Sequence, residues 1–174
     1  MESKYGQSDC KCIHYREKFP NCSYESNAVS DHSPGSVKDN EILIRTIFRE
    51  NDIDKGGLVK PVHFRQDPVA RGFSVDRVSL MGTELLEKSK LSDKRYDGFL
   101  KFVSVPAKEL RELLEGEKRL FCIYDTGTPE NKFHADICQN LVYEKGIDNR
   151  KNLMKEISWI LYEAFSNPKS DPPA

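Results

Sequence analysis

The sequence lacks any apolar run long enough to cross a membrane. Its longest apolar stretches, residues 121–124 and 157–161, fall far short of the roughly 20 residues that a membrane-spanning helix requires. Residues 1–9 also lack the apolar core of a secretory signal. We therefore expect a protein that has no membrane partner, is not secreted and resides in the cytoplasm.

An excess of charge of either sign is absent as well. The 174 residues include 27 Lys and Arg against 28 Asp and Glu, which gives a formal net charge of −1. No global field then draws the chain to nucleic acid or to an anionic membrane. The net charge therefore argues against nucleic acid as a partner, and such binding would need a local basic patch.

The glycine patterns of common nucleotide sites are missing too. The pair Gly56-Gly57 has neither the spacing of a phosphate-cradling loop nor that of a dinucleotide fingerprint. The same loop fails as a calcium site, because His63 stands where a bidentate Glu is needed. Ser74 is not set in the Gly-x-Ser-x-Gly pattern of many hydrolases. These absences argue against a Rossmann, P-loop or EF-hand site and against a nucleophile elbow.

Cysteines are few, and their number, five, is odd. Without an export signal we expect reduced thiols, with Cys122 acting as a small buried hydrophobe. Residues Cys10, Cys12, His14 and Cys22 have the ligand types of a structural zinc site. Their Cys-x-Cys-x-His spacing is not that of the usual zinc knuckle, so cysteines in a mobile tail are the alternative hypothesis.

The periodicity of the chain predicts one folded domain. Residues 1–38 hold no sustained period and are interpreted as a flexible or irregular extension, residues 39–166 as the domain, and residues 167–174, with three prolines, as a disordered tail. The order of elements favours an α+β fold, with a mixed, mostly antiparallel sheet packed by about three helices. Extended segments are predicted at 42–48, 58–65, 71–78, 99–105, 120–124 and 133–137, and helices at 83–91, 106–115 and 148–164.

Arginines occur where their charge is costly or where they are closely spaced. Arg45 interrupts the apolar run at 43–47, where a guanidinium needs a partner or a cleft. Guanidinium groups hold phosphate or carboxylate by two bonds at once, so we predict an arginine-rich cleft for an anionic, nucleotide-like ligand. The predicted ligand-binding residues are Arg45, Arg65, Arg71, Ser74, Arg77 and Tyr124.

A plainer interpretation exists for the same arginines. Arg45 could lie at a strand end and reach solvent along its aliphatic stem. The later arginines could belong to a solvated strand, paired with Asp67 and Asp76.

Histidines supply the candidate catalytic residues. The spacing of His134 and Asp136 lets both side chains emerge on one face of a strand, as a metal pair or a base with its orienting carboxylate would. Together with His63 they would make a hydrolytic or nucleolytic site that uses a metal ion. The alternative is a histidine held structurally by Asp136.

The order of elements, with Arg45 on the first strand, resembles small ADP-ribosyltransferase-like domains. This resemblance covers topology, not a motif, and it implies a nucleotidyl or ADP-ribosyl transferase. The sequence departs from that class because it offers no securely placed catalytic glutamate. The non-enzyme alternative is a protein-interaction module anchored by Trp159, which lies opposite the apolar stripe of the last predicted helix.

Overall fold

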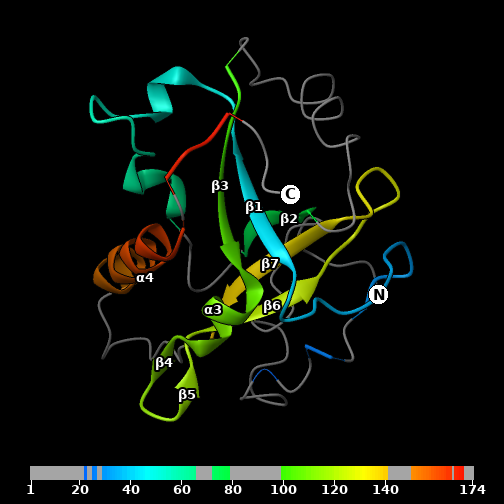
Figure 1. Cartoon of the computed structure of the whole chain (residues 1–174). Coiled ribbons are helices and arrows are strands. Elements are labelled where there is room, and N and C mark those ends of the chain that lie inside the picture. Colours follow the sequence, from blue (N-terminus) through cyan, green and yellow to red (C-terminus); the bar gives the residue numbers. More distant parts are fainter. Residues whose placement is uncertain are drawn as a thin grey trace.

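A five-stranded sheet forms the centre of the protein (Figure 1). The structure is a computed structural model, and it describes residues 22, 25–26, 29–65, 72–78, 99–140, 150–165 and 167–170. The strand order is β3-β1-β2-β7-β6, and every pairing among these strands is antiparallel. The strands are β1 (Ile42–Ile47), β2 (Phe73–Arg77), β3 (Lys101–Pro106), β6 (Phe121–Asp125) and β7 (His134–Gln139).

Few helices accompany this sheet. The described residues contain two α-helices, α3 (Ala107–Glu112) and α4 (Arg150–Ala164), and two short 3₁₀ helices, η1 (Glu50–Asp52) and η2 (Pro61–Phe64). An α+β fold is therefore confirmed, with two α-helices in the described ranges instead of about three. The helix predicted at 83–91 lies outside the described residues. No helix in the described part of the chain is long and apolar enough to cross a membrane.

Two predicted segments take other forms. The segment at 58–65 is not a strand. Lys60 is extended, but Pro61 follows it at the first-turn position of η2 and ends the extended conformation. The helix predicted to run to Gly116 ends at Glu112. The chain then forms a hairpin of β4 (Leu114–Glu115) and β5 (Lys118–Arg119), and Gly116, with φ of +61°, lies in its turn.

One face of the sheet packs into the hydrophobic core and is called the core face. Figure 1 shows α4 and η2 next to each other on this side. Phe64 of η2 stacks on Phe73 of β2 at 5.5 Å and packs against Phe165 at 5.3 Å between ring centroids. The buried strand residues of the core are Leu43, Ile47, Phe73, Val75, Val103, Val105, Phe121, Ile123, Ala135 and Ile137.

The described part of residues 1–38 is irregular in backbone but is not a free tail. Cys22 forms a disulfide with Cys122, and the buried Glu25 accepts a hydrogen bond from the amide of Ile123. Further along, the amide of Ser30 donates to Oδ2 of Asp125 at 2.9 Å. The described residues 22, 25–26 and 29–37 are called the N-terminal strap, because Cys22, Glu25 and Ser30 bond to residues 122–125 of the outer strand β6.

Candidate functional site

Polar side chains gather on the face of the sheet opposite the core face. In β2 the residues alternate, with Phe73 and Val75 on the core face and with Ser74 and Asp76 on the other. The same alternation in β7 places Ala135 in the core. The alternation of apolar and polar residues in the sequence thus gives each strand one apolar face and one polar face.

Strand register brings the polar residues of β2, β7 and β6 together. Ser74 is the cross-strand partner of Asp136, and Asp76 is the partner of His134. On the other side of β7, Tyr124 is opposite Asp136. Four predicted site residues therefore meet on one face. We define the His134 cluster as Ser74, Asp76, Thr126, Asn131, His134 and Asp136.

Hydrogen bonds fix the members of the His134 cluster in pairs. Oγ of Ser74 donates to Oδ1 of Asp136 at 3.1 Å. Nδ2 of Asn131 donates to Oδ1 of Asp76 at 2.7 Å, and Nδ1 of His134 lies 2.7 Å from Oγ1 of Thr126. Within the described ranges, the second carboxyl oxygen of Asp136, Oδ2, is buried and has no hydrogen-bond partner. A buried acceptor of this kind is costly and is typical of a functional site.

Both carboxyl groups of the cluster favour their protonated form more than an ordinary aspartate does. Burial raises the pKa of Asp136, although His134, Thr126, Ser74 and Arg45 oppose the shift. Burial also raises the pKa of Asp76, against the effects of Asn131, His134 and Arg45. Pairs of groups with perturbed pKa values are typical of acid–base sites.

Arg45 belongs to this site through its charge. The register of β1 with β2 consists of Leu43 with Arg77 and Ile44 with Asp76. Beyond that point Nη1 of Arg45 donates to the carbonyl of Ser74 at 2.7 Å, and its guanidinium lies 5.0 Å from the ring centroid of Phe73. Arg45 thus bridges the two strands where their ladder ends. Its charge partly opposes the rise in pKa that burial causes in both cluster carboxyls.

Arg77, a predicted ligand-binding residue, is instead an internal structural group. Its side chain is 2% exposed. Nε and Nη2 each donate to the carboxylate of Glu41 at 2.7 Å, and Nη1 donates to the carbonyl of Gly35 at 2.7 Å. These bonds tie the N-terminal strap to β2. Arg65 is exposed just after η2, and Arg71 lies outside the described residues.

His63 does not join His134 and Asp136. It lies in η2, which covers the core face, whereas the His134 cluster is on the opposite face. Its Nε2 is 2.9 Å from Oδ1 of Asp52. Across the described ranges, no three His, Cys, Asp or Glu side chains are close enough to share a metal ion. A metal-assisted site of His63, His134 and Asp136 is therefore not assembled.

The cysteines contradict the prediction of reduced thiols. Cys22 and Cys122 form a disulfide with 5.3 Å between their Cα atoms, and Cys138 is also disulfide-bonded. A sulfur in a disulfide is not a thiolate, so Cys22 is no zinc ligand in this structure. The other proposed ligands, at positions 10, 12 and 14, lie outside the described residues. Because disulfides persist mainly in oxidising compartments, the basis for predicting a cytoplasmic location is removed.

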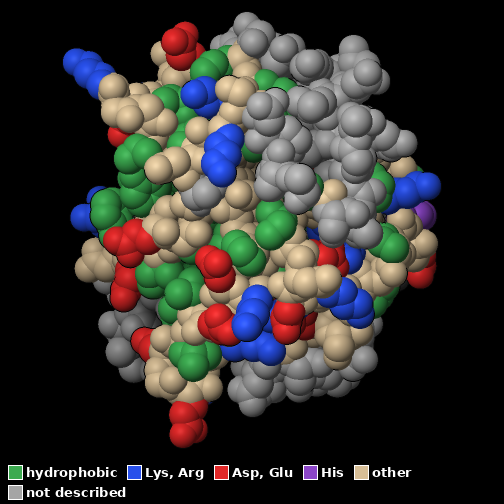
Figure 2. Space-filling model, in the orientation of Figure 1, with side chains coloured by type: hydrophobic (Ala, Val, Ile, Leu, Met, Phe, Trp, Pro, Cys, Tyr) green, Lys and Arg blue, Asp and Glu red, His purple; other side chains and the backbone are tan. Residues whose placement is uncertain are grey.

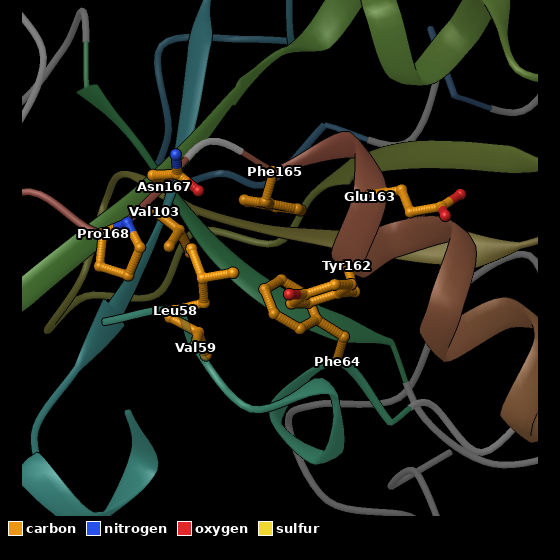
Figure 3. A pocket seen from close by; sticks show the side chains of 9 residues that line it. All are labelled: Leu58, Val59, Phe64, Val103, Tyr162, Glu163, Phe165, Asn167 and Pro168. Atoms are coloured by element: carbon orange, nitrogen blue, oxygen red, sulfur yellow. The ribbon is translucent and has the colours of Figure 1, made fainter. Parts of the chain in front are cut away.

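A pocket of about 180 Å³, lined mainly by apolar residues, lies between α4 and the segment before η2 (Figure 3). The rings of Tyr162 and Phe64 meet edge to face there, 5.8 Å between centroids, while Glu163 points away. Trp159 is 51% exposed, packs on Tyr162 at 5.3 Å and donates to Glu163 at 2.7 Å. The pocket is lined by Leu58, Val59, Phe64, Val103, Tyr162, Glu163, Phe165, Asn167 and Pro168.

Acidic and basic side chains are interspersed among the described residues of the face drawn in Figure 2. Within the described ranges, Arg111 forms ion pairs with both Glu25 and Asp39.

Sequence reasoning missed part of the His134 cluster. Thr126 and Asn131 belong to a segment whose Gly and Pro residues predict a turn, and a turn pattern does not by itself predict site residues. A usable signal was present, because polar residues in a loop that connects two site strands are often functional. Asp76 is an arginine partner only in the plainer interpretation, and the structure instead bonds it to Asn131 on the same face as Ser74.

No protein-family model, curated protein or solved structure matches this chain. The topological resemblance to ADP-ribosyltransferase-like domains therefore stays a prediction, and the function has to be argued from the geometry of the site.

Proposed function

We propose that this protein is an enzyme that works by general acid–base catalysis at His134. The observation that carries the proposal is the contact of 2.7 Å between Nδ1 of His134 and Oγ1 of Thr126, beside the buried carboxyl of Asp136. Histidine is the commonest proton-transfer group in enzymes because its charge changes near physiological pH.

The contact assigns a role to each ring nitrogen. The Thr126 hydroxyl favours the ionised form of Asp136, as a donor does. Because threonine has one hydroxyl proton, its oxygen then accepts the proton of Nδ1 from His134. In the neutral ring Nε2 carries no proton and acts as the base. No described group bonds to Nε2, and the His134 side chain is partly exposed.

This arrangement suits hydrolysis or group transfer. His134 would take a proton from an attacking water or hydroxyl and return it to the leaving group, while the carboxyl of Asp136 stabilises the imidazolium through Thr126. Transfer from an anionic, nucleotide-like donor remains our proposal for the reaction class, since Arg45 places a permanent positive charge beside the cluster.

The test is turnover of a panel of nucleotides, dinucleotides and phosphosugars, followed by chromatography. We expect His134→Asn to lower the rate by about 100-fold or more, the usual contribution of a general base. Thr126→Val should lower it as well, whereas Thr126→Ser should retain most activity. The exposed His32→Asn is the control. Turnover that His134→Asn leaves unchanged would refute the assignment.

A second candidate is a protein-interaction module, which the exposed Trp159 beside the apolar pocket favours. Its sign would be binding of a protein without turnover of any compound. Trp159→Ala should then abolish capture of the partner, and Lys155→Ala, an exposed substitution on the same helix, should not.

A further inference from the structure

We infer that Arg45, Arg49 and His63 form a binding pocket for the anionic group of a substrate. A cavity of about 150 Å³ lies beside them, and we call it the anion pocket. It is lined by Arg45, Thr46, Ile47, Phe48, Arg49, Asp52 and His63. As a statement about substrate class the inference rests on the proposed function, but binding at the pocket can be measured by itself.

Local structure brings these residues together from two segments. β1 supplies Arg45, and the chain continues through Arg49 into η1. A bridge between Ile53 and Val59 then folds the chain back, and the amide of Lys60 donates to the carbonyl of Asp52 at 2.9 Å. η2 begins directly after this bond and presents His63 to the pocket.

The charge of the pocket favours an anion. Arg45 and Arg49 are always positive, and Asp52 is the single acidic group among the lining residues. The carboxylate of Asp52 is directed to Nε2 of His63 at 2.9 Å. Arg49 is exposed and makes no side-chain hydrogen bond or ion pair within the described residues. The lining thus holds two arginines against one carboxylate, and the exposed Arg49 is available to an anion.

Arg45 is prepared for binding by its surroundings. Its guanidinium lies over the ring of Phe73, and one end is fixed by the carbonyl of Ser74. A planar group held in this way loses little further freedom when it binds a phosphate or carboxylate.

The size of the pocket limits what it holds. At about 150 Å³ it is smaller than the roughly 300–1,000 Å³ of sites that enclose a drug-sized ligand. It therefore fits one phosphate or carboxylate group, with the rest of the substrate outside. Arg45 also influences the carboxyls of Asp76 and Asp136, so its charge connects the pocket with the His134 cluster on the opposite face of the sheet.

Calorimetry with inorganic phosphate tests the pocket, with acetate as the probe for carboxylates, both at constant ionic strength. We expect phosphate to bind the wild-type protein and Arg49→Ala to weaken binding by about tenfold, as loss of one charged hydrogen-bond donor does. His63→Gln should weaken it too. Arg65→Ala, an exposed arginine outside the lining, should bind like the wild type. Tighter binding of acetate than of phosphate would assign the pocket to a carboxylate.

Two outcomes would overturn the pocket: no binding of either anion to the wild type, or equal weakening by Arg49→Ala and Arg65→Ala. Failure of the proposed function is distinguishable. Phosphate that binds in the pocket of a protein without turnover would refute the enzyme and leave the pocket intact. Turnover that phosphate does not inhibit would refute the pocket and leave the role of His134 intact.

Discussion

The backbone of Gly72 lies directly against the side chain of Asp136. A Cβ atom at Gly72 would stand 2.8 Å from Cβ of Asp136, a distance that real Cβ atoms do not adopt. We predict that Gly72→Ala displaces β2 from β7 at this point and lowers the free energy of unfolding by about 1–3 kcal/mol, the usual cost of overpacking. Urea unfolding measures it.

A matched control for that substitution is Gly56→Ala. Its Cβ would meet the exposed side chain of Asp54 at 3.2 Å from Oδ1, a contact that a shift of a few tenths of an ångström relieves while Oδ1 keeps its bonds to the amides of Gly56 and Leu58. We expect a change well below that of Gly72→Ala. Equal losses in the two variants would contradict the close packing of Gly72 on Asp136.

The raised pKa of Asp136 makes a prediction about stability and pH. A carboxyl whose pKa is higher in the folded state than its ordinary value of 3.8 lowers stability progressively as pH rises above that value through the folded pKa. Asp136→Asn removes this penalty. The melting temperature of Asp136→Asn, compared with that of the wild type, should therefore rise as the pH is raised from about 4 to about 7. The activity of this variant should be lost.

Thermal unfolding at several pH values checks this prediction, with the exposed Asp31→Asn as the control. A difference between Asp136→Asn and the wild type that does not change with pH would show that burial of the ionised carboxyl has no cost.

The buried pair of Arg77 and Glu41 should dominate acid stability. Burial alone would raise the pKa of Glu41, but hydrogen bonds from Arg77 and from the amide of Lys38 outweigh it, so the pKa is lowered. Its stabilisation is present above the ordinary value of 4.5 and is lost as pH falls through the folded pKa.

Removal of the arginine tests the same pair. Arg77→Met leaves a buried carboxylate without its partner and should cost about 3–5 kcal/mol in urea unfolding. The double variant Arg77→Met with Glu41→Leu should lose less, because the carboxylate of Glu41 is no longer left without its partner. Arg77 also lies 3.7 Å from the buried carboxyl of Asp125, so the double variant should still be less stable than the wild type. A double variant that is less stable than Arg77→Met would contradict a cost of the unpaired Glu41 carboxylate.

The disulfide between Cys22 and Cys122 closes a loop of large sequence separation, 100 residues. Loop-closure entropy predicts that Cys22→Ser with Cys122→Ser costs about 4–5 kcal/mol. Thiol titration in denaturant provides a direct check: Cys22, Cys122 and Cys138 should not react before reduction. Reaction of these three thiols in the unreduced protein would contradict the pairing.

Strong periodicity was sufficient to predict much of the fold. The run at 42–48 became β1, the run at 120–124 became β6, and the apolar stripe of the last helix became the buried side of α4. In the segment at 58–65 the spacing of Val62 and Phe64 imitates a strand. There the fixed φ of Pro61, which opens η2, decided the outcome, and periodicity does not report it.

The site was harder to predict because its contacts are long in sequence. His134 and Asp136 were found, since two residues on one strand share a face by local geometry alone. The bond of Asn131 to Asp76 spans 55 positions, and the disulfide of Cys22 spans 100. Such pairings depend on strand register and on the path of the strap, which local sequence patterns do not report.

The N-terminal strap also determines how much of the chain can fold by itself. The carbonyls of Gly35 and Ser36 accept hydrogen bonds from Arg77, and the carboxyl of Asp125, next to Thr126, accepts one from the amide of Ser30. A chain that begins at the predicted boundary near residue 39 would leave the buried side chains of Arg77 and Asp125 without these hydrogen-bond partners. The smallest autonomous folding unit therefore includes the strap. The loop that follows Asp125 and orients His134 through Thr126 is held in place by Ser30, far upstream in the sequence.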